Sequence, residues 1–220
     1  MTLKIYQLDA AAMTPYYDIA LCRALARAGG EVRYITSPFL YDSDLPLPRE
    51  YHTDLLYFAR LDRPSLIRYP ILRRLLRALL YRFGHLRLLR QIDSDPPDVV
   101  HIQWSRFPLL DRWLLTQIQQ RDIPIVHTVH DVIPLFAHAQ STSLSAVYER
   151  ADRLIVHAAS NRDALLSLYP ALAAERVRII PHILPYHPLP GGSQAQARRT
   201  LGIPSGVPVL LFFGSIRPYK

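Results

Sequence analysis

Side chains able to bind or activate a substrate follow the ends of two predicted strands. His130 and Asp131 come directly after the apolar run at residues 124–129, and Trp104 follows the run at residues 98–103. An imidazole exchanges protons near neutral pH, and a neighbouring carboxylate can fix its tautomer or raise its pKa. An indole ring can stack on a sugar or a base. His130 and Asp131 are therefore candidates for catalysis and Trp104 for ligand contact. The alternatives are structural roles, for Trp104 that of a half-buried side chain at the domain rim.

The end of the first predicted strand carries a second group of candidates. Thr14, Tyr16 and Tyr17 lie where a helix is predicted to begin, with Thr14 as its N-cap and Pro15 at its first position. The two tyrosines can bind a sugar or phosphate at a helix N-terminus, or pack as an aromatic cap on the loop. Neither G-x-G-x-x-G nor G-x-x-x-x-G-K-[ST] occurs, which argues against a dehydrogenase or P-loop site.

No metal site is expected from the sequence. His127 and His130 lie on opposite faces of a continued strand, so they cannot hold one zinc ion together. His101 lies within a predicted strand and is expected in the core. Cys22, the only cysteine, lies among the apolar positions of a predicted helix and is expected to pack as a small core residue.

The end of the chain contains Gly214, Arg217 and Lys220 after an apolar strand at residues 208–213. A glycine turn with two cations suits a diphosphate, and a solvated basic loop is the alternative.

Alternating elements predict the class α/β, a doubly wound and mostly parallel Rossmann-like sheet. The predicted strands are residues 3–8, 31–36, 55–59, 98–103, 124–129, 153–157 and 177–180. The predicted helices are residues 15–28, 69–90 (with a break considered at Gly84), 109–120, 144–150, 160–169 (capped by Ser160) and 194–201. We expect residues 1–183 to form one Rossmann-like domain and residues 184–206 a linker with a short helix. Residues 207–220 are expected to be the first strand and turn of an incomplete second domain.

Charge suggests an anionic partner. The net charge is +8, carried almost entirely by arginine, and nine arginines face a single aspartate in residues 60–90. In the helix predicted there, Leu72, Leu75, Leu76, Leu79, Phe83 and Leu86 form an apolar arc. The helix can lie on an anionic membrane, or cover the sheet with its arginines in solvent. With no signal peptide or membrane span in the sequence, we expect a cytoplasmic protein, with peripheral binding to the inner face of the plasma membrane as an option.

Five segments in order resemble the retaining glycosyltransferases of family 4, which have the GT-B fold. They are DVVHIQ (residues 98–103), PIVHTVHDVIP (124–134), ADRLIVHAAS (151–160), VRIIPH (177–182) and VLLFFGSIRPYK (209–220). The resemblance covers roughly the last 120 residues well and the first 95 only by topology.

The resemblance implies two Rossmann-like domains, the first for the acceptor and the second for a nucleoside diphosphate sugar. It places His130, with Asp131, near the transferred sugar, and Thr14, Tyr16, Tyr17 and Trp104 on the acceptor side. Gly214 and Lys220 match the donor-phosphate motif of the family; Ser215 stands where an arginine is common, and Arg217 comes two places later. Residues 10–15 replace the usual glycine-rich loop.

The implied reaction transfers a hexose from the nucleotide sugar to a hydroxyl of a lipid-linked, polysaccharide or other acceptor, with retained anomeric configuration. No metal or cofactor is expected. Two alternatives remain: a non-catalytic Rossmann-like module that binds anionic membrane or a protein partner, and a nucleic-acid-binding protein. The second lacks any recognition motif, so no specific nucleic acid is expected.

Overall fold

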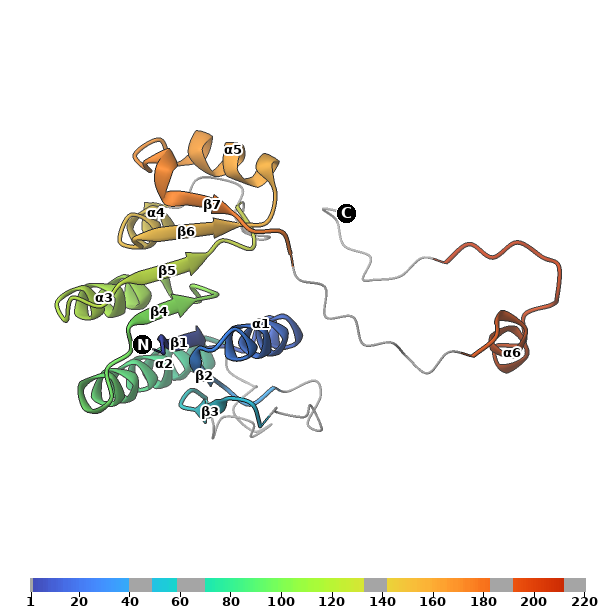
Figure 1. The fold of residues 1–220 in the computed structure, drawn as a ribbon, viewed down its shortest axis with the longest axis horizontal. Helices are drawn as coiled ribbons and strands as arrows, with labels where there is room; N and C mark the ends of the chain where they lie inside the picture. Colours follow the sequence, from blue (N-terminus) through green and yellow to red (C-terminus); the bar gives the residue numbers. More distant parts are fainter. Residues whose placement is uncertain (1, 40–48, 59–69, 133–141, 183–191, 212–220) are drawn as a thin grey trace. The chain divides into compact units, whose positions relative to one another are not determined.

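The structure is a computed structural model that describes residues 2–39, 49–58, 70–132, 142–182 and 192–211 (Figure 1). The chain divides into two compact units, Met1–Pro185 and Tyr186–Lys220. The first unit holds the sheet and all but one of the helices found in these ranges.

The first unit is built on a parallel sheet of seven strands in the order β3-β2-β1-β4-β5-β6-β7. The strands are β1 (Lys4–Asp9), β2 (Glu31–Thr36), β3 (His52–Leu55), β4 (Val99–Ile102), β5 (Ile125–Thr128), β6 (Arg153–Val156) and β7 (Val177–Ile179). The order reverses between β1 and β4, which are neighbours in the sheet although a long stretch of chain separates them. The predicted α/β class and doubly wound parallel sheet are confirmed.

Helices cover both faces of this sheet. They are α1 (Pro15–Arg27), α2 (Pro70–Ser94), α3 (Pro108–Gln119), α4 (Thr142–Tyr148) and α5 (Ala159–Leu168), and a short 3-10 turn (Ala174–Arg176) precedes β7. Side chains alternate along a strand, so Ile5 of β1 packs with α1 around Cys22. Tyr6 and Leu8 point the other way, into the larger core shared with α2 and α3. Cys22 is fully buried, as expected.

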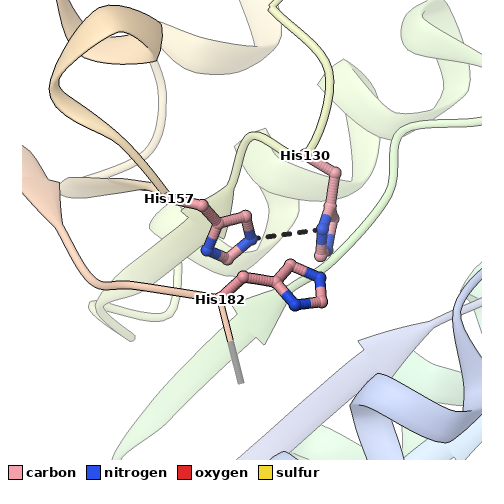
Figure 2. A group of neighbouring side chains, drawn as sticks. All are labelled: His130, His157 and His182. Atoms are coloured by element: carbon pink, nitrogen blue, oxygen red, sulfur yellow. Dashed lines mark hydrogen bonds between the residues drawn. The ribbon is translucent and has the colours of Figure 1, made fainter. Parts of the chain in front are cut away.

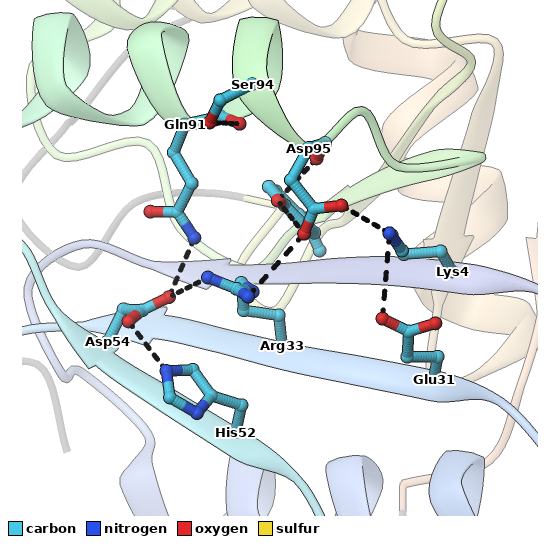
Figure 3. A network of polar contacts seen from close by, with 9 residues as sticks. Lys4, Glu31, Arg33, His52, Asp54, Gln91, Ser94 and Asp95 are labelled. Carbon is cyan, nitrogen blue, oxygen red and sulfur yellow. Dashed lines mark hydrogen bonds and ion pairs between the residues drawn. The ribbon is translucent and has the colours of Figure 1, made fainter.

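Polar contacts attach the end of α2 to strands β1–β3 (Figure 3). Asp95, just after the helix, pairs with Lys4 of β1 and lies 3.5 Å from Arg33 of β2. The hydrogen bond from Lys4 lowers the pKa of Asp95. On β3, Asp54 accepts hydrogen bonds from Arg33 Nη1 (3.1 Å) and Gln91 Nε2 (2.8 Å). These contacts hold the edge strand β3, whose side chains are otherwise poorly buried.

Helix α2 runs unbroken through Gly84, so the considered break is absent. Glycine stands there because the ring of buried Tyr57 packs against its Cα, and an added Cβ would overlap that ring. The Tyr57 hydroxyl lies 2.8 Å from His85 Nδ1 in the next position of the helix, which holds the ring in place.

The face of α2 that packs on the sheet is not the predicted apolar arc. The helix is buried through Tyr81, Leu88, Leu89 and Ile92. Four members of the predicted arc, Leu72, Leu75, Leu79 and Phe83, are instead 49–63% exposed. In its first half the helix therefore presents an apolar stripe to solvent.

Three predicted elements differ from the structure. Strand β3 ends at Leu55, where the predicted strand begins, because the apolar residues after it turn inward: Tyr57 enters the core and Phe58 takes a left-handed φ of 48°. Ser160 does not cap α5, which begins at Ala159. Within the predicted strand at residues 208–213, residues 208–211 are not in a strand and have exposed apolar side chains, and residues 212–213 lie outside the described ranges.

In the second unit, helix α6 (Gln194–Thr200) agrees with the prediction. Ser193 caps it, with its hydroxyl accepting a hydrogen bond from the backbone of Gln196 at 3.2 Å. Most of the predicted linker, residues 184–191, lies outside the described part of the chain. None of the described helices is long and apolar enough to cross a membrane.

Candidate functional site

The reversal of strand order between β1 and β4 marks the place where ligands bind in open parallel sheets. Thr14 follows β1 and Trp104 follows β4, so both lie at the carboxyl ends of the strands on either side of the reversal. The indole Nε1–H of Trp104 donates a hydrogen bond to Thr14 Oγ1 at 2.9 Å. Thr14 occupies the N-cap position of α1, but its side chain makes no capping bond; its hydroxyl accepts from Trp104 and donates to Asp18 Oδ2 at 3.4 Å.

The loop between β1 and α1 is organised around one buried carboxylate. Asp9 accepts backbone hydrogen bonds from Met13 (2.6 Å), Thr14 (3.1 Å) and Ala11 (3.3 Å). The N–H groups that a glycine-rich loop would offer to a ligand are therefore directed into the protein. Ala12, at the turn of this loop, has a left-handed φ of 46°.

A second buried carboxyl, Asp18 of α1, lies beside Asp9. Burial, followed by the nearby charge of Asp9, raises the pKa of Asp18 well above its ordinary value. Burial also raises the pKa of Asp9. The hydrogen bonds that Asp9 accepts from Asp18 and from the loop backbone lower its pKa, but burial has the larger effect. We assign the proton to Asp18, because Asp9 has three backbone donors that favour its ionised form. Tyr34 donates to Asp18 Oδ2 at 3.3 Å.

His130, two residues beyond the end of β5, is held by contacts on its face and its edge. Its ring stacks on Trp104, with centroids 4.7 Å apart and planes at 9°, and meets the ring of Tyr17 edge-on at 5.1 Å. Its Nε2 lies 2.8 Å from Gln103 Oε1, and its Nδ1 lies 3.3 Å from His157 Nε2. Both ring nitrogens thus have partners, and neither partner is Asp131.

The imidazole of His130 is neutral at physiological pH. Burial, assisted by the neighbouring His157, lowers the pKa of His130 to about 3. A neutral ring of such low pKa is a weak base that can accept a hydrogen bond, and it supplies no positive charge to a phosphate. Asp131 is half-buried, and burial raises its pKa.

Two further histidines meet His130 at the same edge of the sheet (Figure 2). His157 follows β6 and His182 follows β7, and their ring centroids are 4.8 Å apart. Tyr17 contacts all three rings, and its ring centroid lies 4.7 Å from that of His182 and 5.6 Å from that of His157. The nitrogens of the three histidines that could hold a metal all lie within 4.8 Å of one another.

The predicted acceptor-side residues are only partly brought together. Thr14, Tyr17 and Trp104 lie with His130 in one contact network, whereas Tyr16 is 45% exposed and its ring meets Phe39 instead. The predicted donor-phosphate residues, Gly214, Arg217 and Lys220, lie outside the described residues.

Two more histidines of the sheet are structural. Burial lowers the pKa of His101 to about 3 and that of His127 to about 4. His101 Nε2 lies 2.8 Å from Thr128 Oγ1, and His127 Nε2 lies 3.1 Å from Ser105 Oγ. The expected core position of His101 is confirmed.

The sequence reasoning missed three site residues: Gln103, His157 and His182. Each lies at or just beyond the carboxyl end of a strand, which is the signal that identified His130 and Trp104. His157 was included in its predicted strand, which ends one residue earlier in the structure. The expectation of a metal-free protein considered only His127 with His130, since nothing in the spacing links residues 130, 157 and 182.

Comparisons with known proteins agree with this architecture. The sequence model of Glycosyltransferase Family 4 matches residues 19–184, well over half of the chain. A D-inositol 3-phosphate glycosyltransferase of Kineococcus radiotolerans is 32% identical over 127 residues, covering 50% of this chain and 26% of that protein. Its counterpart in Thermobispora bispora is 27% identical over 238 residues, covering 96% of this chain and 50% of that protein. The chain thus spans half or less of the length of these relatives.

Solved structures share the fold at low sequence identity. A glycosyltransferase of Rickettsia africae aligns with a TM-score of 0.62 at 15% identity, over 94% of this chain and 51% of that one. UGT89C1 of Arabidopsis thaliana, solved with quercetin, aligns with a TM-score of 0.61 at 13% identity, over 92% of this chain and 55% of that one. The matched family and the shared α/β architecture together show that the chain belongs to Glycosyltransferase Family 4 and has the Rossmann-like fold of GT-B glycosyltransferases.

Proposed function

We propose that this chain is the acceptor-side part of a glycosyltransferase that moves a hexose from a nucleoside diphosphate sugar to an acceptor hydroxyl. The observation that carries the proposal is the neutral His130 stacked on Trp104 at the reversal of strand order. Family membership supports the reaction class, and the family resemblance implies retention of anomeric configuration. The neighbour UGT89C1 has been solved with UDP and with UDP-L-rhamnose, which supports a nucleotide sugar as donor.

The residues then divide into roles. His130 accepts a hydrogen bond from a substrate hydroxyl, because its low pKa keeps it neutral, while Gln103 and Trp104 fix the orientation of its ring. Tyr17 and Thr14 complete the wall of the acceptor side. We keep Gly214, Arg217 and Lys220 as the proposed donor-phosphate group, since cationic side chains stabilise a departing diphosphate without a metal ion. The relatives named for inositol 3-phosphate favour a hydroxyl acceptor on a polyol or a glycan.

The test is a donor screen on the complete protein. Nucleoside diphosphate sugars are incubated with acceptor extracts, and the released nucleoside diphosphate is measured for the wild type, His130→Ala and a control, His52→Ala. His52 lies on the edge strand β3 with an exposed side chain. Removal of one positioned hydrogen-bonding group from an active site typically costs about 100-fold or more, so we expect that loss of activity in His130→Ala and none in His52→Ala. Full activity in His130→Ala contradicts the role of His130, and no release with any donor by the folded wild type contradicts the reaction.

The apolar stripe on α2 supports a second proposal, that this surface docks on an anionic membrane. Leu72, Leu75, Leu79 and Phe83 project outward at helical spacing, with Leu75 63% exposed. Exposed Arg73 and Arg74 lie in the same half of the helix. An apolar stripe with exposed arginines in the same half of the helix matches a bilayer of acidic lipids, whose headgroups are negative and whose acyl chains accept leucine and phenylalanine. Docking of this kind would bring a lipid-linked acceptor to the same protein at the cytoplasmic face.

Co-sedimentation with vesicles tests the docking surface. The wild type, Leu75→Ser/Leu79→Ser and Leu109→Ser are compared on vesicles of acidic lipid mixed with phosphatidylcholine and on phosphatidylcholine alone. Leu109 is a matched control because it is 71% exposed on another helix, α3. We expect binding to acidic vesicles, loss in the double variant and retention in Leu109→Ser. Equal binding by all three proteins, or none by the wild type, refutes docking through α2.

A further inference from the structure

Three imidazoles converge at the carboxyl edge of the sheet from three consecutive strands. His130 follows β5, His157 follows β6 and His182 follows β7 (Figure 2). Their potential ligand nitrogens lie within 4.8 Å of one another, and one pair, His130 Nδ1 and His157 Nε2, is 3.3 Å apart. Imidazole nitrogen is the preferred protein ligand of zinc, copper and nickel.

The outer nitrogens of two of these rings have carbonyl partners that fix the protons. His157 Nδ1 lies 3.0 Å from the backbone oxygen of Ile180, which can only accept, so Nδ1 carries the hydrogen and Nε2 has the lone pair. His130 Nε2 faces Gln103 Oε1 at 2.8 Å, so this nitrogen donates and Nδ1 has the lone pair. The Gln103 amide is oriented by its own nitrogen, which lies 3.2 Å from His101 Nε2.

As a result, two lone pairs face each other. His130 Nδ1 and His157 Nε2, 3.3 Å apart, repel unless a proton or a metal cation lies between or beside them. A metal ion placed beside the two nitrogens would bind both lone pairs. Metal-bound histidines usually donate their second N–H to a carbonyl or carboxylate, as both of these rings do.

The distances suit a three-histidine site after a small movement. With zinc–nitrogen bonds of about 2.0–2.1 Å, tetrahedral geometry sets ligand nitrogens about 3.4 Å apart. The His130–His157 pair is already at this separation. His182 is exposed and lies three residues beyond β7, so the remaining difference of about 1.4 Å falls on the least constrained ring. Tyr17 packs against all three rings and shields the site on one side.

We propose that His130, His157 and His182 form a binding site for a divalent transition-metal ion of the zinc class, with one coordination position left for water or substrate. This site does not rest on the glycosyltransferase proposal, but the two share His130, so a bound ion would compete with a hydroxyl for the lone pair on His130 Nδ1. It departs from the metal-free protein expected from the sequence.

Cobalt titration of the complete protein, freed of any affinity tag and treated with a chelator, tests the site without donor or acceptor. Bound Co²⁺ is followed by its visible absorption, and Zn²⁺ is added in competition. The variants are His182→Ala, which alters an exposed ring, Gln103→Leu, which removes the acceptor for His130, and His52→Ala as the control. Circular dichroism checks the folding of each variant.

We expect one ion per chain, displaced by Zn²⁺, in the wild type and in His52→Ala. His182→Ala should lose stoichiometric binding, and Gln103→Leu should bind about 10- to 100-fold more weakly, the usual effect of removing the partner of a metal-bound histidine. The absence of stoichiometric binding by the folded wild type, or unchanged binding by His182→Ala, overturns the proposal. Neither outcome depends on transferase activity.

Discussion

Replacement of Asp18 by asparagine should remove a pH-dependent cost to stability that arises beside the candidate site. The Asp18 side chain is fully buried next to Asp9, and burial with the charge of Asp9 raises its pKa well above the ordinary value. The folded state therefore keeps a proton that the unfolded chain releases once the pH passes the ordinary carboxyl pKa. Stability is highest below that pKa and falls as the pH rises toward the folded pKa.

The change in the free energy of unfolding with pH follows from the number of protons that the folded state keeps and the unfolded chain releases. One carboxyl of the pair holds one proton, and one proton corresponds to at most about 1.4 kcal/mol for each pH unit between the two pKa values. Asparagine resembles a protonated carboxyl in shape and does not titrate, so Asp18→Asn loses this slope. We expect the variant to be more stable than the wild type at pH 8, with a difference that shrinks as the pH is lowered toward 4.

Urea unfolding followed by circular dichroism at each pH unit from 4 to 8 gives the difference directly. Asp163→Asn is the matched control, since Asp163 is a helical aspartate whose side chain is 77% exposed. Its stability should follow the wild type at each pH. A difference between Asp18→Asn and the wild type that grows toward low pH would show that Asp18 is ionised in the folded state, and it would refute the assignment of the proton.

Three other changes have defined outcomes. Gly84→Ala gains up to about 1 kcal/mol of helix propensity, but the added methyl group overlaps the Tyr57 ring, which typically costs about 1–3 kcal/mol. The free energy of unfolding measured in urea should therefore fall. A rise would contradict the packing of Tyr57 on Gly84. Trp104→Phe keeps a ring but removes the N–H that binds Thr14, and should lower the free energy of unfolding by about 0.5–1.5 kcal/mol; an unchanged value would mean that this bond contributes nothing. If the metal site exists, Zn²⁺ at 100 times its dissociation constant should stabilise the wild type by about 2.7 kcal/mol in thermal unfolding and leave His182→Ala unchanged.

The fold could be predicted because its inner strands are buried on both faces and read as apolar runs. Strand β3 is the informative exception: it is an edge strand of mixed exposure, while the more apolar residues after it leave the sheet, so hydrophobicity predicted the wrong segment. The sequence also left open whether the apolar arc of α2 covers the sheet or faces outward, and the structure shows four of its members exposed. A helical wheel finds an apolar arc, but only tertiary packing decides that Leu88 is buried and Leu75 exposed.

The candidate site was predictable one strand at a time. His130 and Trp104 can be identified as candidates from the sequence, because each follows the end of a strand that the sequence predicts. Their partners His157 and His182 depend on the order β5-β6-β7 in space and on ring orientations fixed by Gln103 and by a backbone carbonyl. No spacing in the sequence carries that information.

The Asp9-centred loop holds its backbone in place independently of its exposed side chains. A loop that binds through its own backbone constrains its sequence, because each N–H must stay in place for the ligand. Here Asp9 uses the N–H groups of Ala11, Met13 and Thr14 internally, and the scaffold is complete before any substrate arrives. Met13 and Tyr16 are exposed on this scaffold. These two side chains can therefore be exchanged without disturbing the loop backbone or the contacts around His130.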